Sequence, residues 1–148
     1  MVHIQASQEI KALPEVVWSL VADASGWQRW SPMDESGLEQ PGSPEADGVG
    51  AIRRFRTGRI VSREQVIAFE GPRRLAYTLL SGLPLRDYRA DVLLTPSPSG
   101  TRVEWKSQFR AKVFGTGWIY GFMLRRFLRQ LLAALAAEAE KKQAIATS

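Results

Sequence analysis

The sequence predicts an α+β protein with a single domain over residues 1–148, in which a long C-terminal helix covers one face of an antiparallel sheet. Three observations support this prediction. Helical and strand patterns occupy separate stretches of the chain, as they do in α+β proteins. Residues 102–112 alternate between polar and apolar side chains, which is typical of a strand covered on one face. Residues 118–142 carry an apolar stripe that requires a large apolar partner surface.

The N-terminal region is expected to form a strand followed by a helix. Residues 3–12 place apolar side chains at intervals among polar ones, which indicates the strand. Residues 13–23 indicate the helix, because Pro14 suits its first position and apolar residues then recur three and four apart. Gly26 is expected to end this helix.

A second short helix and a loop are expected next. Trp27 and Trp30 lie three residues apart and predict a short helix, which Pro32 stops. Residues 36–50 are rich in glycine, proline, serine and acids, so they are interpreted as a loop before the next strand.

Five further strands are expected between this loop and the long helix, within residues 49–58, 59–70, 75–82, 83–96 and 101–113. In the last of them, Trp105, Ser107 and Phe109 share the apolar face. In the strand before it, the same alternation turns Tyr88 inward. One face of the sheet is therefore expected to be covered and the other to meet solvent.

The long helix would extend about 37 Å at 1.5 Å per residue. Arg125, Arg126 and Arg129 are expected on its outer side. The remaining stripe, expected against the covered face of the sheet, consists of Ile119, Tyr120, Met123, Leu124, Phe127, Leu128, Leu131, Leu132 and Leu135. The apolar run falls short of the roughly 20 residues that span a bilayer.

The composition excludes several kinds of active site. The chain has no cysteine, so it cannot build a thiolate nucleophile or a thiolate metal site. Its single histidine, His3, excludes a multi-histidine metal site. No metal and no cofactor are expected. The first residues lack the pattern of a secretory signal, so a cytoplasmic protein is expected.

The charge is unevenly distributed. Residues 1–50 carry a net charge of −6 and residues 51–148 a net charge of +11. One interpretation is an ordinary solvated surface with arginines at the sheet edges. The other is a basic face for transient contact with an anionic membrane or an acidic carrier protein. No nucleic-acid-binding motif is present, so nucleic acid is not expected as a partner.

The order of elements and several segments resemble the START-like (Bet v 1-like, SRPBCC) superfamily, and within it the polyketide cyclase/dehydrase and lipid transport branch. The likeness covers essentially the whole chain and is carried by "ALPEVVWSLVAD", "WQRWSP", "GVGAIRRF", residues 66–96, "GTRVEWKSQF" and the terminal helix. It implies a helix-grip fold, with a curved seven-stranded antiparallel sheet around the C-terminal helix and an apolar cavity between them. Six strands follow from the pattern, and the seventh is expected from a split near residues 82–84.

The resemblance implies a hydrophobic ligand in this cavity. Strand and helix residues that are expected to line it, with the loop leucines at 83 and 85, are Phe55, Tyr77, Leu83, Leu85, Tyr88, Trp105, Ser107, Phe109, Trp118, Phe122 and Met123. The alternative for each of them is an ordinary place in the core. For the two leucines, gating of the cavity and packing within their own turn are equally compatible with the sequence.

Few polar residues are placed for chemistry. Glu64 and Tyr88 are the candidates for acid–base catalysis, whereas Arg53, Tyr77 and Ser107 could orient a ligand. The alternative for Glu64 is a surface carboxylate paired with a neighbouring arginine. Plentiful apolar lining and scarce catalytic groups favour binding or transport of a small hydrophobic ligand. The alternatives are a polyketide cyclase or dehydratase acting in the same cavity, and a non-catalytic interaction module.

Overall fold

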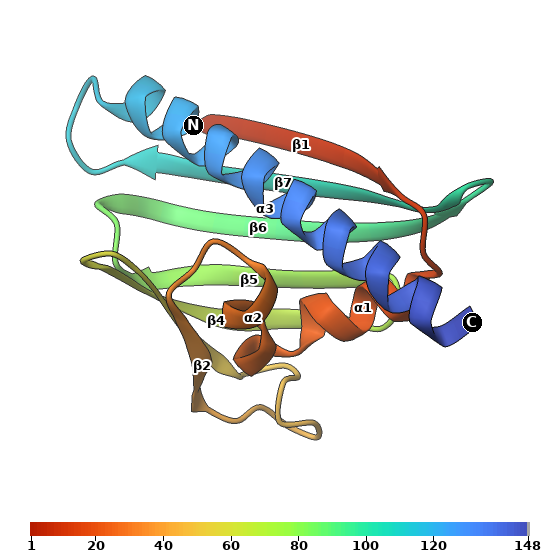
Figure 1. Ribbon diagram of the computed structural model, residues 1–148. Helices are drawn as coiled ribbons and strands as arrows, with labels where there is room; N and C mark the ends of the chain where they lie inside the picture. Colours follow the sequence, from red (N-terminus) through yellow and green to blue (C-terminus); the bar gives the residue numbers. More distant parts are fainter. Residues whose placement is uncertain (148) are drawn as a thin grey trace.

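The computed structural model describes residues 1–147, and seven strands of this part form one antiparallel sheet with the order β1-β7-β6-β5-β4-β3-β2 (Figure 1). The strands are β1 (Val2–Ile10), β2 (Glu35–Gln40), β3 (Ile52–Thr57), β4 (Ile60–Glu70), β5 (Arg74–Ser81), β6 (Leu85–Ser97) and β7 (Gly100–Ala111). The helices are α1 (Pro14–Ala22), the 3-10 helix η1 (Ala24–Gly26), α2 (Trp27–Trp30) and α3 (Gly117–Thr147). The predicted α+β class and helix-grip arrangement are confirmed.

All the helices lie on the inner face of the sheet, and α3 crosses it diagonally, starting over β1 and β7 and ending beside α1 (Figure 1). The predicted alternation in β7 is confirmed, because Val103, Trp105, Ser107 and Phe109 are buried. The intervening side chains of β7, such as Lys106 and Arg110, are half-buried or exposed on the outer face. Apolar burial on one face therefore holds the sheet and α3 together.

The seventh strand is β2, in the region that the sequence predicts to be a loop. β2 is the edge strand and pairs with β3 alone, so it needs no continuous apolar pattern on either face. The expected split near residues 82–84 is wrong. Gly82 stays in the β5–β6 turn with φ 120°, and a side chain there would meet the Val61 carbonyl oxygen at 2.5 Å.

The two halves of α3 meet different surroundings. Residues 128–147, called the packed half here, bury Leu128, Leu131, Leu132 and Leu135 against the sheet and α1. Residues 117–127, called the cavity half, have one buried position, Gly121. Arg125, Arg126 and Arg129 are exposed, as predicted.

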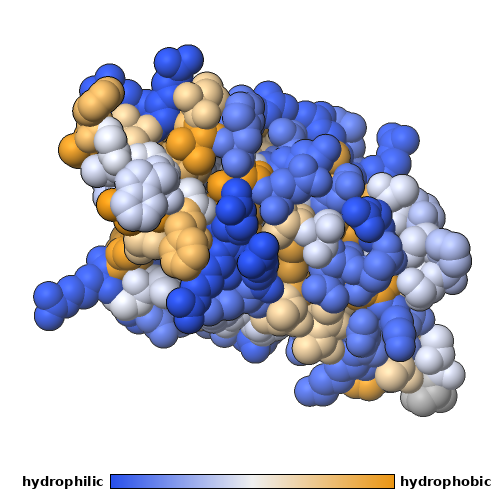
Figure 2. Space-filling model, turned by 90° about the horizontal axis from the view of Figure 1, so that it is seen from above, coloured by the Kyte–Doolittle hydropathy of each residue, from blue (hydrophilic) through white to orange (hydrophobic). Residues whose placement is uncertain are grey.

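The cavity half also exposes aromatic side chains that the sequence predicts to be internal. Trp118 is 74% exposed and Phe122 is 65% exposed, whereas Phe114, in the loop before α3, is fully exposed. Apolar side chains gather at the corresponding end of the molecule, next to strongly hydrophilic ones (Figure 2). Within residues 1–147, no helix is long and apolar enough to cross a membrane.

Candidate ligand-binding cavity

A cavity of about 270 Å³ lies between the cavity half of α3 and strands β3 to β6. Its wall is predominantly apolar and is formed by Trp27, Met33, Thr57, Ile60, Ser62, Glu64, Tyr77, Leu79, Leu83, Tyr88, Tyr120, Met123, Leu124, Phe127, Leu128 and Leu131. Concave apolar sites with a few polar groups are the usual form of small-molecule sites.

The cavity exists because α3 approaches the sheet closely on one side only. Over β1, a methyl group added at Gly117 or Gly121 would lie 3.0 or 3.2 Å from the Val2 side chain. Tyr120, from the same turns as these glycines, and Phe127, further along α3, belong to the cavity wall. Small residues on one flank and large ones on the other leave a space that no side chain of the helix fills.

The cavity reaches the surface at one end. Met123 of α3 and Ile60 of β4 line it and are still 54% and 49% exposed. Leu83, in the β5–β6 turn, also lines it and is half-buried. These three side chains mark a mouth between the start of α3 and the ends of β4 and β5.

A buried ion pair adjoins the cavity through Glu64, which belongs to its wall. Arg53 is 1% exposed, and its Nη2 donates to Glu64 Oε1 at 2.9 Å. The guanidinium carbon lies 4.9 Å, 5.1 Å and 4.9 Å from the ring centroids of Trp27, Phe55 and Tyr77. Within residues 1–147, Arg53 Nε and Nη1 have no hydrogen-bond partner. The three rings and one carboxylate thus stabilise a cation that water cannot reach.

Two tyrosines add hydroxyl groups beside this pair. Trp105 Nε1 donates to the Tyr77 hydroxyl at 3.1 Å, so the proton of this hydroxyl can be donated elsewhere. The Tyr88 hydroxyl lies 3.2 Å from Ser107 Oγ. The rings of Tyr77 and Tyr88 are stacked with centroids 6.3 Å apart. Both rings belong to the cavity wall.

A β-bulge places Tyr88 at the cavity. The register of β6 against β7 shifts between Arg86 and Arg89, and Asp87 has a φ of 53°. An extra residue at a bulge exchanges the inward and outward positions that follow it. Leu85 and Tyr88 therefore both turn inward, although they are three residues apart.

Burial changes the acidity of three groups in the wall, Glu64, Tyr77 and Tyr88. It raises the pKa of Glu64, and the adjacent Arg53 cation acts against this rise. It raises the pKa of Tyr88 to about 12 and that of Tyr77 well above its ordinary value. Both tyrosines are neutral hydrogen-bonding groups at physiological pH. Among the described residues, no cluster of histidine, cysteine or carboxylate side chains could hold a metal ion.

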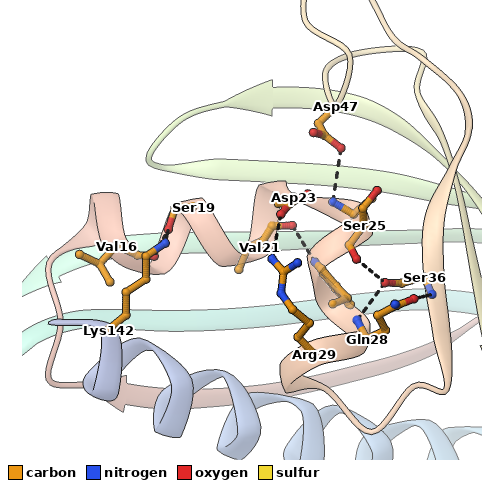
Figure 3. Close-up of polar contacts among 12 residues, drawn as sticks. Val16, Ser19, Val21, Asp23, Ser25, Gln28, Arg29, Ser36, Asp47 and Lys142 are labelled. Carbon is orange, nitrogen blue, oxygen red and sulfur yellow. Dashed lines mark hydrogen bonds and ion pairs between the residues drawn. The ribbon is translucent and has the colours of Figure 1, made fainter. Parts of the chain in front are cut away.

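Polar contacts connect the segment from α1 to β2 (Figure 3), and Trp27 of this segment belongs to the cavity wall. Trp27 Nε1 donates to the Val21 carbonyl at 3.1 Å. Gln28 N donates to Ser36 Oγ at 2.9 Å, and Ser36 N donates to Gln28 Oε1 at 3.0 Å. This exchange attaches α2 to the edge strand β2 and explains how a strand with little apolar side-chain area is held.

Of the predicted ligand-binding residues, the structure brings Tyr77, Leu83, Tyr88 and Met123 together at the cavity. Five others are buried outside its wall, namely Phe55, Leu85, Trp105, Ser107 and Phe109. Three of these support the tyrosines, since Trp105 and Ser107 form hydrogen bonds to them and Phe109 stacks on Tyr88.

Two predicted lining residues point away from the cavity. Trp118 and Phe122 are exposed because the opposite flank of the same turns, with Gly121 over Val2 and Tyr120 beside the cavity, faces the sheet. The two loop leucines are not exposed, since Leu83 lines the cavity and Leu85 is buried.

The carboxylate of Glu64 is paired with an arginine, as one interpretation of the sequence held, but this pair is buried and does not lie at the surface. Six further wall residues were not predicted from the sequence, namely Trp27, Met33, Thr57, Ile60, Ser62 and Leu79. For Ile60 and Ser62 a signal was available, because alternate residues of a strand share a face and both lie an even number of residues before the buried Val66.

The fold and the cavity together define a START-like protein of the SRPBCC superfamily. More narrowly, the chain belongs to the polyketide cyclase / dehydrase and lipid transport family, whose pattern matches residues 1–140. The uncharacterized protein Rv2574 of Mycobacterium tuberculosis is 29% identical, over 83% of this chain and 78% of its own.

Solved structures share the fold. A START superfamily protein from Mycobacterium smegmatis superposes with a TM-score of 0.80 at 16% identity, covering 94% of this chain and 97% of that chain. A Thermobifida fusca protein gives 0.79 at 25% identity, covering 95% of each. The major latex-like protein 151 of Panax ginseng gives 0.72 at 12% identity, covering 93% and 97%.

Proposed function

We propose that the protein binds and transports a small hydrophobic ligand, such as a lipid or polyketide, in the cavity under α3. The observation that carries this proposal is a predominantly apolar cavity that opens to the surface and has few polar groups in its wall. Transfer of apolar ligand surface out of water contributes about 25 cal/mol per Å² before the costs of association.

The wall also supports a preference among ligands. The volume of about 270 Å³ lies just below the usual range of drug-sized sites, which begins near ~300 Å³. Tyr77 offers a hydroxyl proton and Glu64 a carboxylate, so a ligand hydroxyl group at the end of an apolar body can accept from Tyr77 and donate to Glu64. A ligand carbonyl group can accept from Tyr77 only. This size favours a compact ligand over a long folded chain.

Filling the cavity tests this proposal. Ser62 lies in the wall, and Ser62→Phe places a ring in the space without removing any lining contact. Thr78→Phe adds the same ring on the opposite face of the adjacent strand β5, next in sequence to Tyr77. We expect an apolar fluorescent dye to bind the natural protein and Thr78→Phe, and to bind Ser62→Phe at least tenfold more weakly.

Native mass spectrometry of gently purified protein provides the second measurement. The expected result is a bound small molecule that is lost in Ser62→Phe and kept in Thr78→Phe. Absence of both dye uptake and a bound molecule in the natural protein would overturn the proposal.

The alternative function is catalysis, as a polyketide cyclase or dehydratase. A carboxyl group with a raised pKa and two phenols in one apolar cavity are groups that can move protons. The test is turnover of a poly-β-keto substrate, with loss in Glu64→Gln or Tyr88→Phe. Turnover in both variants that is unchanged from that of the natural protein would exclude these two residues from catalysis.

Location and partners are part of the same proposal. A carrier of an apolar ligand must collect and deliver it, which is the reason to propose transient contact with a membrane or an acidic carrier protein. A cytoplasmic location is proposed as well, and fractionation of cells that produce the protein tests it.

A further inference from the structure

The start of α3 and the loop before it form an exposed apolar surface, called here the aromatic patch, which consists of Val113, Phe114, Trp118 and Phe122. Their exposed fractions run from 57% to 103%. The patch lies at the end of the molecule where apolar side chains gather in Figure 2. Contiguous exposed aromatic side chains are uncommon on proteins that have no partner at that surface.

Basic side chains continue the exposed face of the helix beyond the aromatic ones. Positions 118, 122, 125 and 129 follow one another at spacings of three and four, so they share a helix face. Arg125 and Arg129 lie about 4.5 Å and 10.5 Å further along the axis than Phe122. All three arginines of this helix are exposed, and none forms an ion pair with any described residue.

The surrounding sequence contains no compensating acid. From residue 105 to residue 137 there are six basic residues and no aspartate or glutamate. Elsewhere on the sheet, basic residues are paired, as Arg63 is with Glu39 and Arg74 with Asp91. The aromatic patch and its arginines therefore form the one part of this helix face with both apolar area and uncompensated positive charge.

We infer that the aromatic patch and Arg125, Arg126 and Arg129 dock the protein on the surface of an anionic lipid bilayer. The aromatic rings insert at the interface between headgroups and acyl chains, where tryptophan and phenylalanine are favoured. The arginines contact lipid phosphates, which attract basic side chains near the membrane surface. A second copy of the chain is the less suitable occupant, because two such surfaces would bring their positive charges together.

The position of the patch relates docking to the cavity. Trp118 and Phe122 share turns of α3 with Tyr120 and Met123, and Met123 marks the mouth. A bilayer in contact with the patch thus lies beside the opening through which an apolar ligand enters. This link to ligand collection rests on the proposed function, whereas docking itself does not.

The test measures binding to vesicles of phosphatidylcholine with and without phosphatidylglycerol, by co-sedimentation at increasing salt concentration. We expect binding that requires phosphatidylglycerol and weakens with salt. Trp118→Ser/Phe122→Ser should bind at least tenfold more weakly, since the inserted apolar area is lost. Arg125→Gln/Arg126→Gln should bind roughly tenfold to thirtyfold more weakly.

Two control variants match these changes elsewhere on the surface. Val49→Ser removes an exposed apolar side chain from the β2–β3 loop. Arg73→Gln/Lys141→Gln removes two exposed positive charges and so matches the change in net charge. Both controls should bind vesicles within about twofold of the natural protein.

Three results would overturn the inference. The first is that the natural protein does not bind anionic vesicles, and the second is that the patch variants bind them as well as their controls do. The third is a stable dimer in sedimentation velocity that dissociates in Trp118→Ser/Phe122→Ser. Dye uptake without vesicles reports on the cavity alone. Dye uptake with no vesicle binding overturns docking only, whereas vesicle binding with no dye uptake overturns the proposed cavity function only.

Discussion

The two halves of α3 differ in how much of their apolar side-chain area is buried, although they form one continuous helix. The packed half buries leucine and alanine side chains and is attached at its end, where Glu140 accepts from Lys11 N at 3.1 Å and Gln143 accepts from Leu13 N at 3.0 Å. The cavity half touches β1 through two glycines, leaves a space over the sheet and exposes aromatic side chains to solvent.

If the proposed function holds, stability and binding are separated along the helix. Burial of apolar area in the packed half stabilises the fold, whereas the cavity half leaves a space over the sheet and buries less apolar area. The outward side of the cavity half likewise leaves apolar area unburied. The comparison can be tested by substitutions at corresponding places in each half.

The largest effect is expected from breaking the ion pair beside the cavity. Glu64→Ala leaves Arg53 as an unpaired buried cation, which should lower the free energy of unfolding by about 3–5 kcal/mol. The double variant Arg53→Met/Glu64→Leu removes both charges, so its free energy of unfolding should fall by much less. Urea unfolding measures both, and an equal loss in the two variants would show that the pair matters for shape and not for charge.

A smaller effect is expected from shortening side chains in the two halves of α3. Leu135→Ala removes a fully buried side chain and should lower the free energy of unfolding by about 3 kcal/mol. Met123→Ala, at the open mouth of the cavity, should lower it by less than about 1 kcal/mol. Urea unfolding at one pH compares them, and similar losses would contradict the distinction between the halves.

The buried phenols predict an alkaline dependence of stability. The folded pKa of Tyr88, about 12, lies above its ordinary value of 10.0, because burial disfavours the phenolate. The contribution of the neutral phenol is complete below pH 10 and is lost as pH rises toward 12, by about 2 kcal/mol. Between pH 9 and 11.5, the free energy of unfolding should fall less steeply with pH in Tyr88→Phe than in the natural protein.

Titration of phenolate absorbance is the accompanying measurement. The natural protein should show an ionisation near pH 12 that is missing from Tyr88→Phe. An ionisation in the ordinary range of a phenol that is present in the natural protein and missing from Tyr88→Phe would contradict the burial of this group at the cavity.

The smallest effect is expected at the far end of the packed half. Gln143→Ala removes one acceptor for the backbone N–H that begins α1, at an exposed site, and should cost roughly 0.5–1 kcal/mol. Hydrogen exchange should become faster at Leu13 and in the last turn of α3, and stay unchanged in the cavity half. The control is Lys141→Ala, at an exposed position two residues away. An equal loss of stability in this control would show that any change at this end of the helix has the effect, and not the hydrogen bond of Gln143.

Much of the fold could be predicted from the sequence, because apolar periodicity reports which face of an element is covered. The alternation around Trp105 and the stripe through Leu135 placed β7 and α3 correctly. β2 could not be predicted, because an edge strand that is held by β3 and by Ser36 needs little apolar side-chain area of its own. The predicted site was partly displaced, since Trp118 and Phe122 belong to the outer flank of α3.

By itself, the sequence determined the class of fold, the inward faces of β6 and β7 and the outward position of the three arginines. These depend on spacing along one element, which the residue order specifies directly. Only the tertiary structure decided where the space remains, because it depends on how closely Gly117 and Gly121 let the helix approach β1 and on a bulge that turns Leu85 to the same face as Tyr88. Both are relations between segments distant in the chain, which no local pattern encodes.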